Sequence, residues 1–324
     1  MKIQILIFLT LLNIILAKLP NLNKRVLKES TLTSIKSSAK WNPYTTDENP
    51  FKNYSKLEIK GLLGLELTYT NLNIMMLVDN DDHIENFDIP IDFDSRKQWP
   101  DCITPIRTQQ HCGSCWAFSA ATVLSDRYCI ASKGIIKPIL SPQFMLSCDK
   151  SNNACNGGLI DKSWRFLEKT GTSTDDCTPY ASADGKFVPK CENKCVDKIK
   201  ENFKLFKAKK NSSKSLGCAM QIQREMIENG PVQTGFIIYE DFLHYKNGIY
   251  KYTNGSKIGG HAVRVIGWGR EEGTNYWIVA NSWGSNWGEN GYFRIEFGQC
   301  LFEENSYSGE ANFDDFSTYY SKNR

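Results

Sequence analysis

Cys115 combines a reactive residue type with a position that favours its ionised form. It follows Gln109 by six residues and opens the stretch 114–131, in which apolar residues recur at helical spacing. Free N–H groups and the dipole at a helix start favour a thiolate, which attacks carbonyl carbon. Cys115 is therefore the candidate nucleophile, and the alternative is a buried structural thiol.

A thiolate that cleaves an amide needs a partner that holds a proton and then gives it to the leaving amine. The sequence offers four histidines: His83, His111, His244 and His261. His261 follows two glycines, and we expect it to open a strand that projects its side chain into a cleft. His111, four residues before Cys115, is the alternative partner, although we expect it at the surface. We expect His244 to be structural.

Two further side chains complete the predicted constellation. Asn281, twenty residues after His261, can accept the proton of the far imidazole nitrogen, while the indole of Trp283 shields that bond from water. Gln109 can direct its side-chain N–H at a developing oxyanion, beside the backbone N–H of Cys115. The four residues provide a nucleophile, a base, an orienting group and an oxyanion donor.

The elements that must position these residues change in type along the chain. Helical spacing predicts helices at 114–131, 161–169 and about 218–228. Period-two patterns then predict strands at 236–239, 261–268, 276–280 and 292–297. A helical half thus precedes a β-rich half, and a cleft between them is a natural place for chemistry.

The N-terminus predicts the cellular route of the chain. Lys2 precedes a mostly apolar run from Ile3 to Ala17, typical of a secretory signal that is cut after Ala17 and too short to span a bilayer. Such a chain enters an oxidising compartment, in agreement with its eleven cysteines. Three acceptor sequences for glycosylation begin at Asn53, Asn211 and Asn254. The net charge of +3 makes nucleic acid an unexpected partner.

Residues 18–88 contain no cysteine, whereas all eleven cysteines lie between Cys102 and Cys300. This contrast predicts a removable pro-segment at 18–88, and the alternative is a small N-terminal subdomain. The boundary follows the acidic stretch 79–82.

The stretch Cys112-Gly-Ser-Cys-Trp116 resembles the signature of the papain family of cysteine proteases. The resemblance runs from Ile89 to about Gly309 and includes the motifs at 155–158, 259–262, 281–283 and 287–288. Residues 93–100 and 239–243 look like the cathepsin B branch, as does a leader without the long helical signature of cathepsin L-type propeptides.

This resemblance implies an α+β fold with two domains inside a peptidase unit at 89–311. A helical left half would span about 102–200, a right half built on an antiparallel β-barrel about 201–311, and a polar tail 312–324. Cys115 would attack the peptide carbonyl, His261 would protonate the amine, and water would hydrolyse the thioester. The pro-segment would fill the cleft until its removal near Ile89, at acidic pH.

The resemblance also implies substrates, partners and location. It implies protein and peptide substrates, a monomer, cystatin-like inhibitors, no cofactor or metal, and a lysosome-like or digestive vacuole or the extracellular space. Gly157 and Gly158 would bind the substrate backbone in an extended strand. The full set of implied substrate-binding residues is Gly113, Gly157, Gly158, Leu159, Gly235, Gly260, Ala262, Trp283 and Asn305.

Three departures from the branch affect specificity. Cathepsin B grips the C-terminal carboxylate of its substrate with a pair of histidines, whereas the corresponding region here, 177–195, is short and contains none. We therefore expect an endopeptidase. Asn305 stands where a glutamate often forms the floor of the S2 pocket and accepts arginine at P2. A neutral floor should instead favour apolar P2 residues over arginine. Leu301 and Gln110 each replace a usual glycine.

The family pattern suggests four disulfides: Cys102–Cys129, Cys112–Cys155, Cys148–Cys191 and Cys177–Cys195. It leaves open whether Cys218 and Cys300 pair. Three other functions compete with the protease: a non-catalytic homologue that binds peptides, a thiol–disulfide oxidoreductase using Cys112 and Cys115, and a zinc site. The spacing of the cysteines argues against zinc, and no βαβ pattern of the thioredoxin type supports the oxidoreductase.

Overall fold

The computed structural model describes residues 24–67, 88–197 and 202–314. The expected signal peptide at 1–17, the acidic stretch 79–82 and most of the polar tail lie outside this part of the chain. Within the described residues, no helix is both long enough and apolar enough to cross a membrane.

The helical half is built around one central helix. Its elements are α5 (Cys115–Ala131), α6 (Pro142–Cys148), η2 (Ala154–Asn156) and α7 (Ile160–Lys169). The helices predicted at 114–131 and 161–169 are confirmed. The apolar residues at helical spacing in 114–131 predict a helix with one apolar and one exposed face, and this prediction is wrong, because residues 115–129 are all buried. Its polar residues face partners rather than water, since α6, α7 and β7 surround it.

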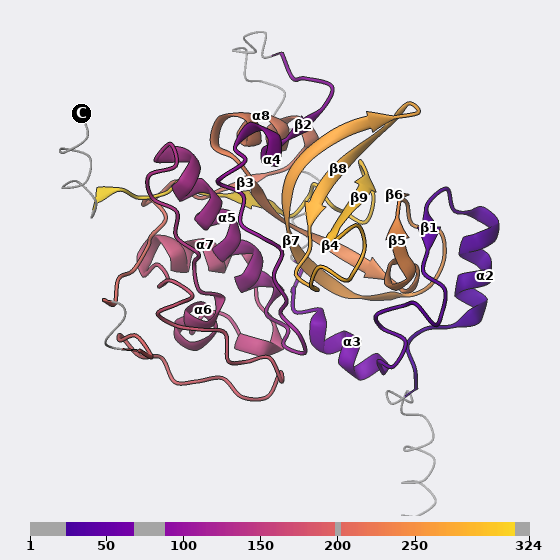
Figure 1. The fold of residues 1–324 in the computed structure, drawn as a ribbon, viewed down its shortest axis with the longest axis horizontal. Helices are drawn as coiled ribbons and strands as arrows, with labels where there is room; N and C mark the ends of the chain where they lie inside the picture. Colours follow the sequence, from indigo (N-terminus) through magenta and orange to yellow (C-terminus); the bar gives the residue numbers. More distant parts are fainter. Residues whose placement is uncertain (1–23, 68–87, 198–201, 315–324) are drawn as a thin grey trace, which may run out of the picture.

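The β-rich half contains an eight-stranded sheet with the order β3-β10-β4-β7-β8-β9-β6, and β2 also pairs with β7. Its strands are β2 (Phe93–Asp94), β3 (Lys214–Leu216), β4 (Val232–Tyr239), β6 (Ile249–Tyr250), β7 (Lys257–Glu271), β8 (Thr274–Ala280), β9 (Tyr292–Glu296) and β10 (Ser306–Ser308). The short helices α4 (Ser95–Gln98), α8 (Ala219–Asn229) and η3 (Glu240–His244) accompany it. Every pairing is antiparallel except that of β6 with β9. The observed class is α+β, as expected (Figure 1).

One strand boundary corrects the sequence analysis. We expected His261 to open a strand, but β7 already begins at Lys257. Gly259 and Gly260 continue the strand by pairing with Ile238 and Ile237 of β4. His261 therefore lies inside the ladder with β4, opposite Phe236, which fixes the direction of its side chain more firmly than a strand end would.

Two buried ion pairs join α5 to the β-rich half. Asp126 contacts Arg264 of β7 at 2.6 Å, and Arg127 contacts Glu225 of α8 at 2.7 Å. All four side chains are almost fully buried. Buried pairs add little net stability, but removing one partner leaves an uncompensated charge. They therefore fix how the two halves meet, and that interface carries the candidate site.

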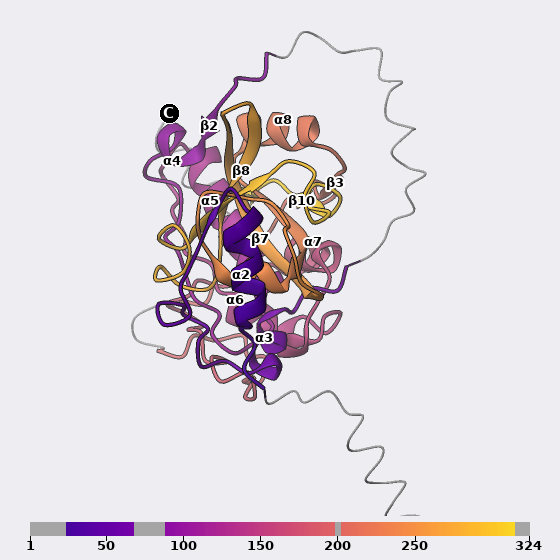
Figure 2. The same cartoon turned by 90° about the vertical axis from the view of Figure 1, so that its right-hand side faces the viewer.

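Residues 24–67 wrap around the outside of this body. They contain α2 (Glu29–Ser38), β1 (Asn42–Pro43) and α3 (Lys56–Leu62), and β1 pairs with β5 (Tyr245–Asn247). Figure 1 shows α2 and β1 along the outer side of the β-rich half, with α3 below and between the two halves. Figure 2 shows α2 lying across the β-rich half. A capping box between Ser55 and Glu58 starts α3, and the carbonyl of its last residue, Leu62, accepts a hydrogen bond from Gln109.

The disulfides agree with the family pattern. The four expected bonds are confirmed as Cys102–Cys129, Cys112–Cys155, Cys148–Cys191 and Cys177–Cys195. Cys115, Cys218 and Cys300 are free. Because Cys112 is bonded to Cys155, it is not a redox partner for Cys115.

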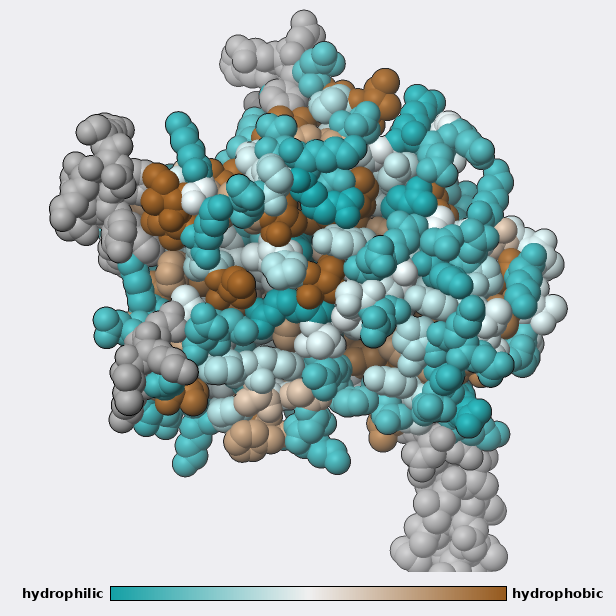
Figure 3. Space-filling model, viewed as in Figure 1, coloured by the Kyte–Doolittle hydropathy of each residue, from teal (hydrophilic) through white to brown (hydrophobic). Residues whose placement is uncertain are grey.

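The surface in Figure 3 is mostly hydrophilic, with apolar side chains in small patches that polar ones separate. The three acceptor asparagines, Asn53, Asn211 and Asn254, are exposed.

Candidate active site

Cys115 is the first residue of α5 and is fully buried. Backbone N–H groups of Ala262 and Gly64 donate hydrogen bonds to its sulfur. Ala262 directly follows His261 in β7, so the candidate nucleophile of the helical half meets the β-rich half beside the candidate base. Gly64 belongs to the expected pro-segment, so the leader contacts the sulfur directly.

The ring of His261 is held from two sides. Its Nε2 lies 2.8 Å from Oδ1 of Asn281, and Trp283 stacks on it with ring centroids 4.7 Å apart. Asn281 Oδ1 also accepts the backbone N–H of Ser282 at 2.8 Å, which fixes the amide. The acceptor at Nε2 selects the tautomer with its proton there, and Nδ1 is buried without a hydrogen bond. The structure thus brings His261, Asn281 and Trp283 together as the sequence predicts.

Burial keeps both groups of the candidate pair neutral in this form of the protein. Burial raises the pKa of the Cys115 thiol to about 11, despite N–H donors from Ala262 and Gly64 that lower it. Burial also lowers the pKa of His261 to about 4, although the hydrogen bond with Asn281 opposes this shift. At pH 7 a pKa of about 11 leaves about one thiol in ten thousand ionised. The thiolate that attacks a carbonyl is therefore suppressed here.

Gln109 is buried and directs its side-chain N–H at a backbone carbonyl of the leader. Its Nε2 donates to the carbonyls of Leu62 at 3.0 Å and Cys112 at 2.8 Å. Its Oε1 accepts from the hydroxyl of Ser282 at 2.7 Å, which fixes the amide. The Leu62 carbonyl therefore lies where the sequence predicts a substrate oxyanion to bind.

Residues 64–66 lie as an extended segment between the two halves. The N–H of Leu65 donates to Gly260 at 3.2 Å, and the N–H of Glu66 donates to Gly158 at 3.0 Å. Gly158 in turn donates to the carbonyl of Gly64 at 2.8 Å. The groove thus binds backbone from both walls, and a peptide in extended conformation matches it.

Glycines bring this segment into direct contact with the site. A Cβ on Gly64 would lie 1.8 Å from the carbonyl oxygen of Gly113, and one on Gly157 would lie 2.9 Å from that of Gly64. A Cβ on Gly260 would lie 2.5 Å from the carbonyl oxygen of Leu65. The predicted substrate-binding residues Gly113, Gly157 and Gly260 therefore line the groove by allowing close approach of backbone.

The side chain of Leu65 enters an apolar pocket at the end of the groove. It lies against Gly235, and Leu159, Ile160 and Asn305 also line this place. Leu65 is 7% exposed and shares a core cluster with Ala262. The predicted pocket residues are thus together, and the sequence analysis omitted Ile160.

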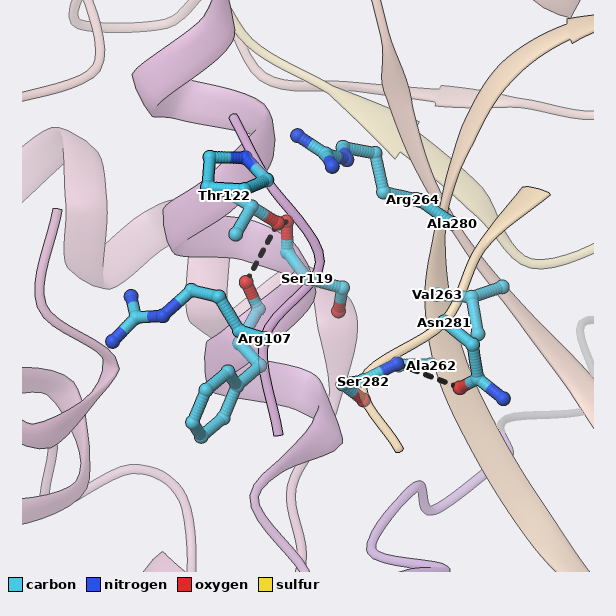
Figure 4. Close-up of a pocket in the computed structure, with 11 residues that line it drawn as sticks. Arg107, Ser119, Thr122, Ala262, Val263, Arg264, Ala280, Asn281 and Ser282 are labelled. Atoms are coloured by element: carbon cyan, nitrogen blue, oxygen red, sulfur yellow. Dashed lines mark hydrogen bonds between the residues drawn. The ribbon is translucent and has the colours of Figure 1, made fainter. Parts of the chain in front are cut away.

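A second, separate cavity lies behind the site. It measures about 20 Å³ and is lined by residues of both halves, among them Ser119, Ala262, Asn281 and Ser282 (Figure 4). A cavity of this size has room for about one water molecule and not for a substrate side chain. The groove that residues 62–66 fill is therefore the binding place.

The two other described histidines lie away from the sulfur. His111 is exposed, and its ring stacks on Tyr54 of the leader at 5.4 Å. The loop 177–195 contacts His111 through the carbonyl of Ala183, which accepts its N–H at 3.0 Å. His244 is buried, and burial lowers its pKa to about 4. Both agree with their expected non-catalytic positions, while His83 lies outside the described residues.

Sequence reasoning missed several residues that support the site. The hydroxyl of Tyr180 donates to the carbonyl of Gln109 at 2.7 Å, and Ser282 holds the side chain of Gln109. Ser282 stands inside the motif at 281–283, so its position was a usable signal. Gly64 and Leu65 had no such signal, because a short apolar stretch with one glycine does not reveal which groove it fills.

Comparison with known proteins identifies the class of protein to which this arrangement of cysteine, histidine and asparagine belongs. The model of the papain family cysteine proteases matches residues 89–309. The chain belongs to this family and is a cysteine protease.

Within the family its similarity is to cathepsin B-like proteins. It is 44% identical over 238 residues to cathepsin B-like cysteine proteinase 4 of Caenorhabditis elegans, covering 64% of this chain and 70% of that protein. It is 42% identical over 227 residues to cathepsin B-like CP2 of Giardia intestinalis, covering 68% and 74%. Among solved structures, procathepsin B S9 from Trypanosoma congolense has a TM-score of 0.78 at 30% identity, covering 89% of this chain and 100% of that one.

Proposed function

We propose that this protein is a cysteine endopeptidase made as a secreted zymogen, with Cys115 as nucleophile and His261 as acid and base. Asn281 orients the imidazole, and Gln109 stabilises the oxyanion. The observation that carries the proposal is that backbone of residues 62–66 engages Gln109, the Cys115 sulfur and Gly158 together. A groove with these contacts suits an extended peptide whose carbonyl meets an oxyanion donor.

The reaction proceeds in two stages, the acylation of Cys115 and the hydrolysis of the thioester. In the first, the thiolate of Cys115 bonds to the peptide carbonyl carbon, and the oxyanion accepts the N–H groups of Gln109 and of the Cys115 backbone. The imidazolium of His261 gives its proton to the amine as the C–N bond breaks. In the second, His261 takes a proton from water, the hydroxide attacks the thioester, and the thiolate leaves. The indole of Trp283 and the Oδ1 of Asn281 keep the ring in one orientation throughout.

Residues 18–88 act in this proposal as an intramolecular inhibitor, with residues 62–66 as the blocking part. Acidification of the purified full chain should produce a shorter form that begins near Ile89. That form should react with an epoxysuccinyl inhibitor, and the Cys115→Ser chain should neither mature alone nor react. Labelling of the Cys115→Ser protein, or full activity of the intact chain, would contradict the proposal.

The contacts of the leader predict weaker inhibition in acid. Glu48 of the leader lies 3.3 Å from Lys246, and the hydrogen bond to Lys246 is the largest cause that lowers its pKa. Burial raises the pKa of Glu240, but the hydrogen bonds from Lys28 and the backbone of Ser256, together with the charges of Lys28 and Lys56, outweigh burial, and the net shift of the pKa is downward. Carboxyls with a lowered pKa stabilise docking above their ordinary value of 4.5, and that contribution is lost as the pH falls through and below it.

We therefore expect a peptide of residues 24–67 to inhibit the matured enzyme several-fold less at pH 4 than at pH 6. The effect per pair is modest, because exposed ion pairs contribute little. Lys246→Ala should flatten the pH dependence of Ki, whereas Lys251→Ala, whose ammonium pairs with Glu296, should not. Stronger inhibition at pH 4 would contradict this reading.

The Leu65 pocket predicts the preference at P2. Leu159, Ile160, Gly235 and Asn305 surround the leucine side chain that fills it, and the carboxylate of Asp161, which also lines this place, pairs with Arg165 at 3.2 Å. We expect kcat/KM with leucine or phenylalanine at P2 to exceed that with arginine by at least tenfold, because a guanidinium would be buried unpaired. Asn305→Glu should narrow that ratio. A higher kcat/KM of the unmodified enzyme with arginine than with leucine at P2 would refute the assignment.

The absence of histidine from the loop 177–195 supports endopeptidase activity. Without an imidazolium there, a free C-terminal carboxylate lacks the pair of histidines that would grip it. A substrate that ends in a free dipeptide and its amide should be cleaved at similar rates. A strong preference for the free acid would instead place the enzyme among dipeptidyl carboxypeptidases.

The sequence signals and the relatives support an environment for this activity. The apolar N-terminal run, the four disulfides and three exposed acceptor asparagines fit passage through the secretory route. A relative of 43% identity in Caenorhabditis elegans is called a gut-specific cysteine proteinase. We propose a digestive or lysosome-like vacuole or the extracellular space, with cystatin-like proteins as inhibitors of a monomeric enzyme.

A further inference from the structure

A stretch of the leader docks on the β-rich half away from the catalytic groove. Residues 41–49 lie against residues 243–251, at the outer side of that half where Figure 1 shows β1 beside β5. We call residues 243–251 the outer strip. None of the residues assigned to catalysis belongs to it.

Trp41 is the main anchor on the outer strip. It is 2% exposed, and its ring lies 6.0 Å from that of Tyr245 and 5.4 Å from that of Tyr250. Its indole N–H donates to the carbonyl of Lys251 at 2.9 Å. A Cβ on Gly248 would come within 3.0 Å of the Trp41 backbone, so this glycine makes room for the anchor. A buried aromatic ring with a satisfied N–H is the usual form of an interface hot spot.

A second anchor and an ion pair follow Trp41 at fixed spacing. Tyr44 is 7% exposed, its N–H donates to the carbonyl of His244 at 2.7 Å, and its hydroxyl donates to the carbonyl of Asn286 at 3.2 Å. The ammonium of Lys246 lies 5.6 Å from the centre of the Tyr44 ring and also pairs with Glu48. Between the anchors, β1 adds to β5 as an antiparallel strand.

Removal of the leader exposes the outer strip. The rings of Tyr245 and Tyr250, the strand edge of β5 and the ammonium of Lys246 remain on the mature enzyme, where the leader no longer covers them. Strand edges and apolar seats of this kind recruit extended segments. The ligand that fits the outer strip is an extended peptide segment with a tryptophan, a tyrosine three residues later and a carboxylate four residues after the tyrosine.

We propose that the outer strip of the matured enzyme is an exosite that holds such a segment of an unfolded protein substrate. This inference rests on the proposed peptidase function and adds a second point of substrate contact to it. In the leader, 21 residues separate Trp41 from Leu62 in the groove. The leader crosses the groove in the direction opposite to a substrate, because Leu65 in the P2 pocket follows Leu62 at Gln109 in sequence. A substrate that also occupies the outer strip is therefore cleaved about 20 residues N-terminal to its tryptophan.

Binding is measured without catalysis. The full chain is matured in acid, Cys115 is blocked with an epoxysuccinyl inhibitor, and a fluorescent peptide of residues 39–50 is titrated by anisotropy. We expect saturable binding, a loss of about thirtyfold with Trp41→Ala in the peptide, and little change with the matched Thr46→Ala. The Lys246→Glu enzyme should bind the peptide less tightly and should recover affinity for the Glu48→Lys peptide.

Substrate use is then compared on the unblocked enzyme. An unfolded substrate that carries residues 39–50 about 20 residues after a cleavage site should show a KM about tenfold below that of its Trp41→Ala, Tyr44→Ala counterpart. The 39–50 peptide should leave cleavage of a short fluorogenic substrate unchanged. Absence of binding, equal KM values, or competition with the short substrate would each overturn the exosite. An enzyme that binds the peptide but cleaves neither substrate would instead refute the proposed function.

Discussion

Replacing His261 with alanine will lower kcat/KM of the matured enzyme by about ten-thousandfold. Its imidazole is the group beside Cys115 that can hold the thiolate as an ion pair and then protonate the leaving amine. Knockouts of a catalytic base in comparable nucleophilic enzymes cost about 10⁴ to 10⁶ in rate. The measurement is steady-state cleavage of a fluorogenic peptide by protein matured in trans, since this variant should not mature itself.

His111→Ala is the matched control, because His111 also lies near Cys115 in sequence but is exposed and stacks on Tyr54. We expect its kcat/KM to change by less than about threefold, the scale of a surface substitution. The unfolding midpoint of each variant separates catalytic loss from misfolding. Equal losses in the two variants, or activity that survives in His261→Ala, would remove His261 from its role.

Replacing Gly64 with alanine will activate the intact chain without acid. The added methyl would lie 1.8 Å from the carbonyl oxygen of Gly113 and 2.3 Å from its carbon. Both are backbone atoms that cannot rotate away, so residues 62–66 must leave the groove or shift in it. Overpacking of this kind costs about 1–3 kcal/mol, which corresponds to about a five- to hundredfold rise in the unblocked fraction.

Gly61→Ala is the control for Gly64→Ala, since it adds the same methyl at a nearby position of the leader. Its Cβ would lie 3.3 Å from the carbonyl of His111, and a helical alanine is favoured over glycine. Activity of the intact chain toward a short substrate at neutral pH should therefore rise for Gly64→Ala and stay low for Gly61→Ala. If Gly64→Ala remains as latent as the unmodified chain, residues 62–66 do not form the block.

The parts of the site that local sequence determines were predictable. Cys115 could be placed at a helix start because apolar spacing follows it, and the pairing of His261 with Asn281 follows from their types and motifs. The disulfide pairs came from the family pattern. These features are determined by short stretches of sequence, in which the residue types alone indicate the chemistry.

The parts that depend on tertiary contact were not predictable. Whether α5 is amphipathic or enclosed depends on what α6, α7 and β7 place around it, and its own spacing does not report that. The start of β7 at Lys257 results from pairing across β4, since Gly259 and Gly260 have little strand preference of their own. The residues of the leader that fill the groove, Leu62, Gly64 and Leu65, are ordinary residues selected by shape.

Two non-glycine residues near the site adopt a backbone conformation that favours glycine. Gln110 and Leu301 replace a usual glycine, and both have positive φ, at 50° and 58°. The left-handed conformation at these positions is the physical reason why glycine suits them. The chain retains the turn beside Gln109 and the turn near the Leu65 pocket in spite of the strain.

The pH dependence of Cys115 alkylation tests the central claim most directly. Iodoacetamide modification is followed on the Cys115 peptide by mass spectrometry, which separates it from Cys218 and Cys300. In the matured enzyme the rate should stay high below pH 6, because His261 holds the sulfur as thiolate, and in His261→Ala it should fall with a midpoint moved toward about 8.5. Identical profiles in the two proteins, both with a midpoint near 8.5, would show that no ion pair forms between Cys115 and His261.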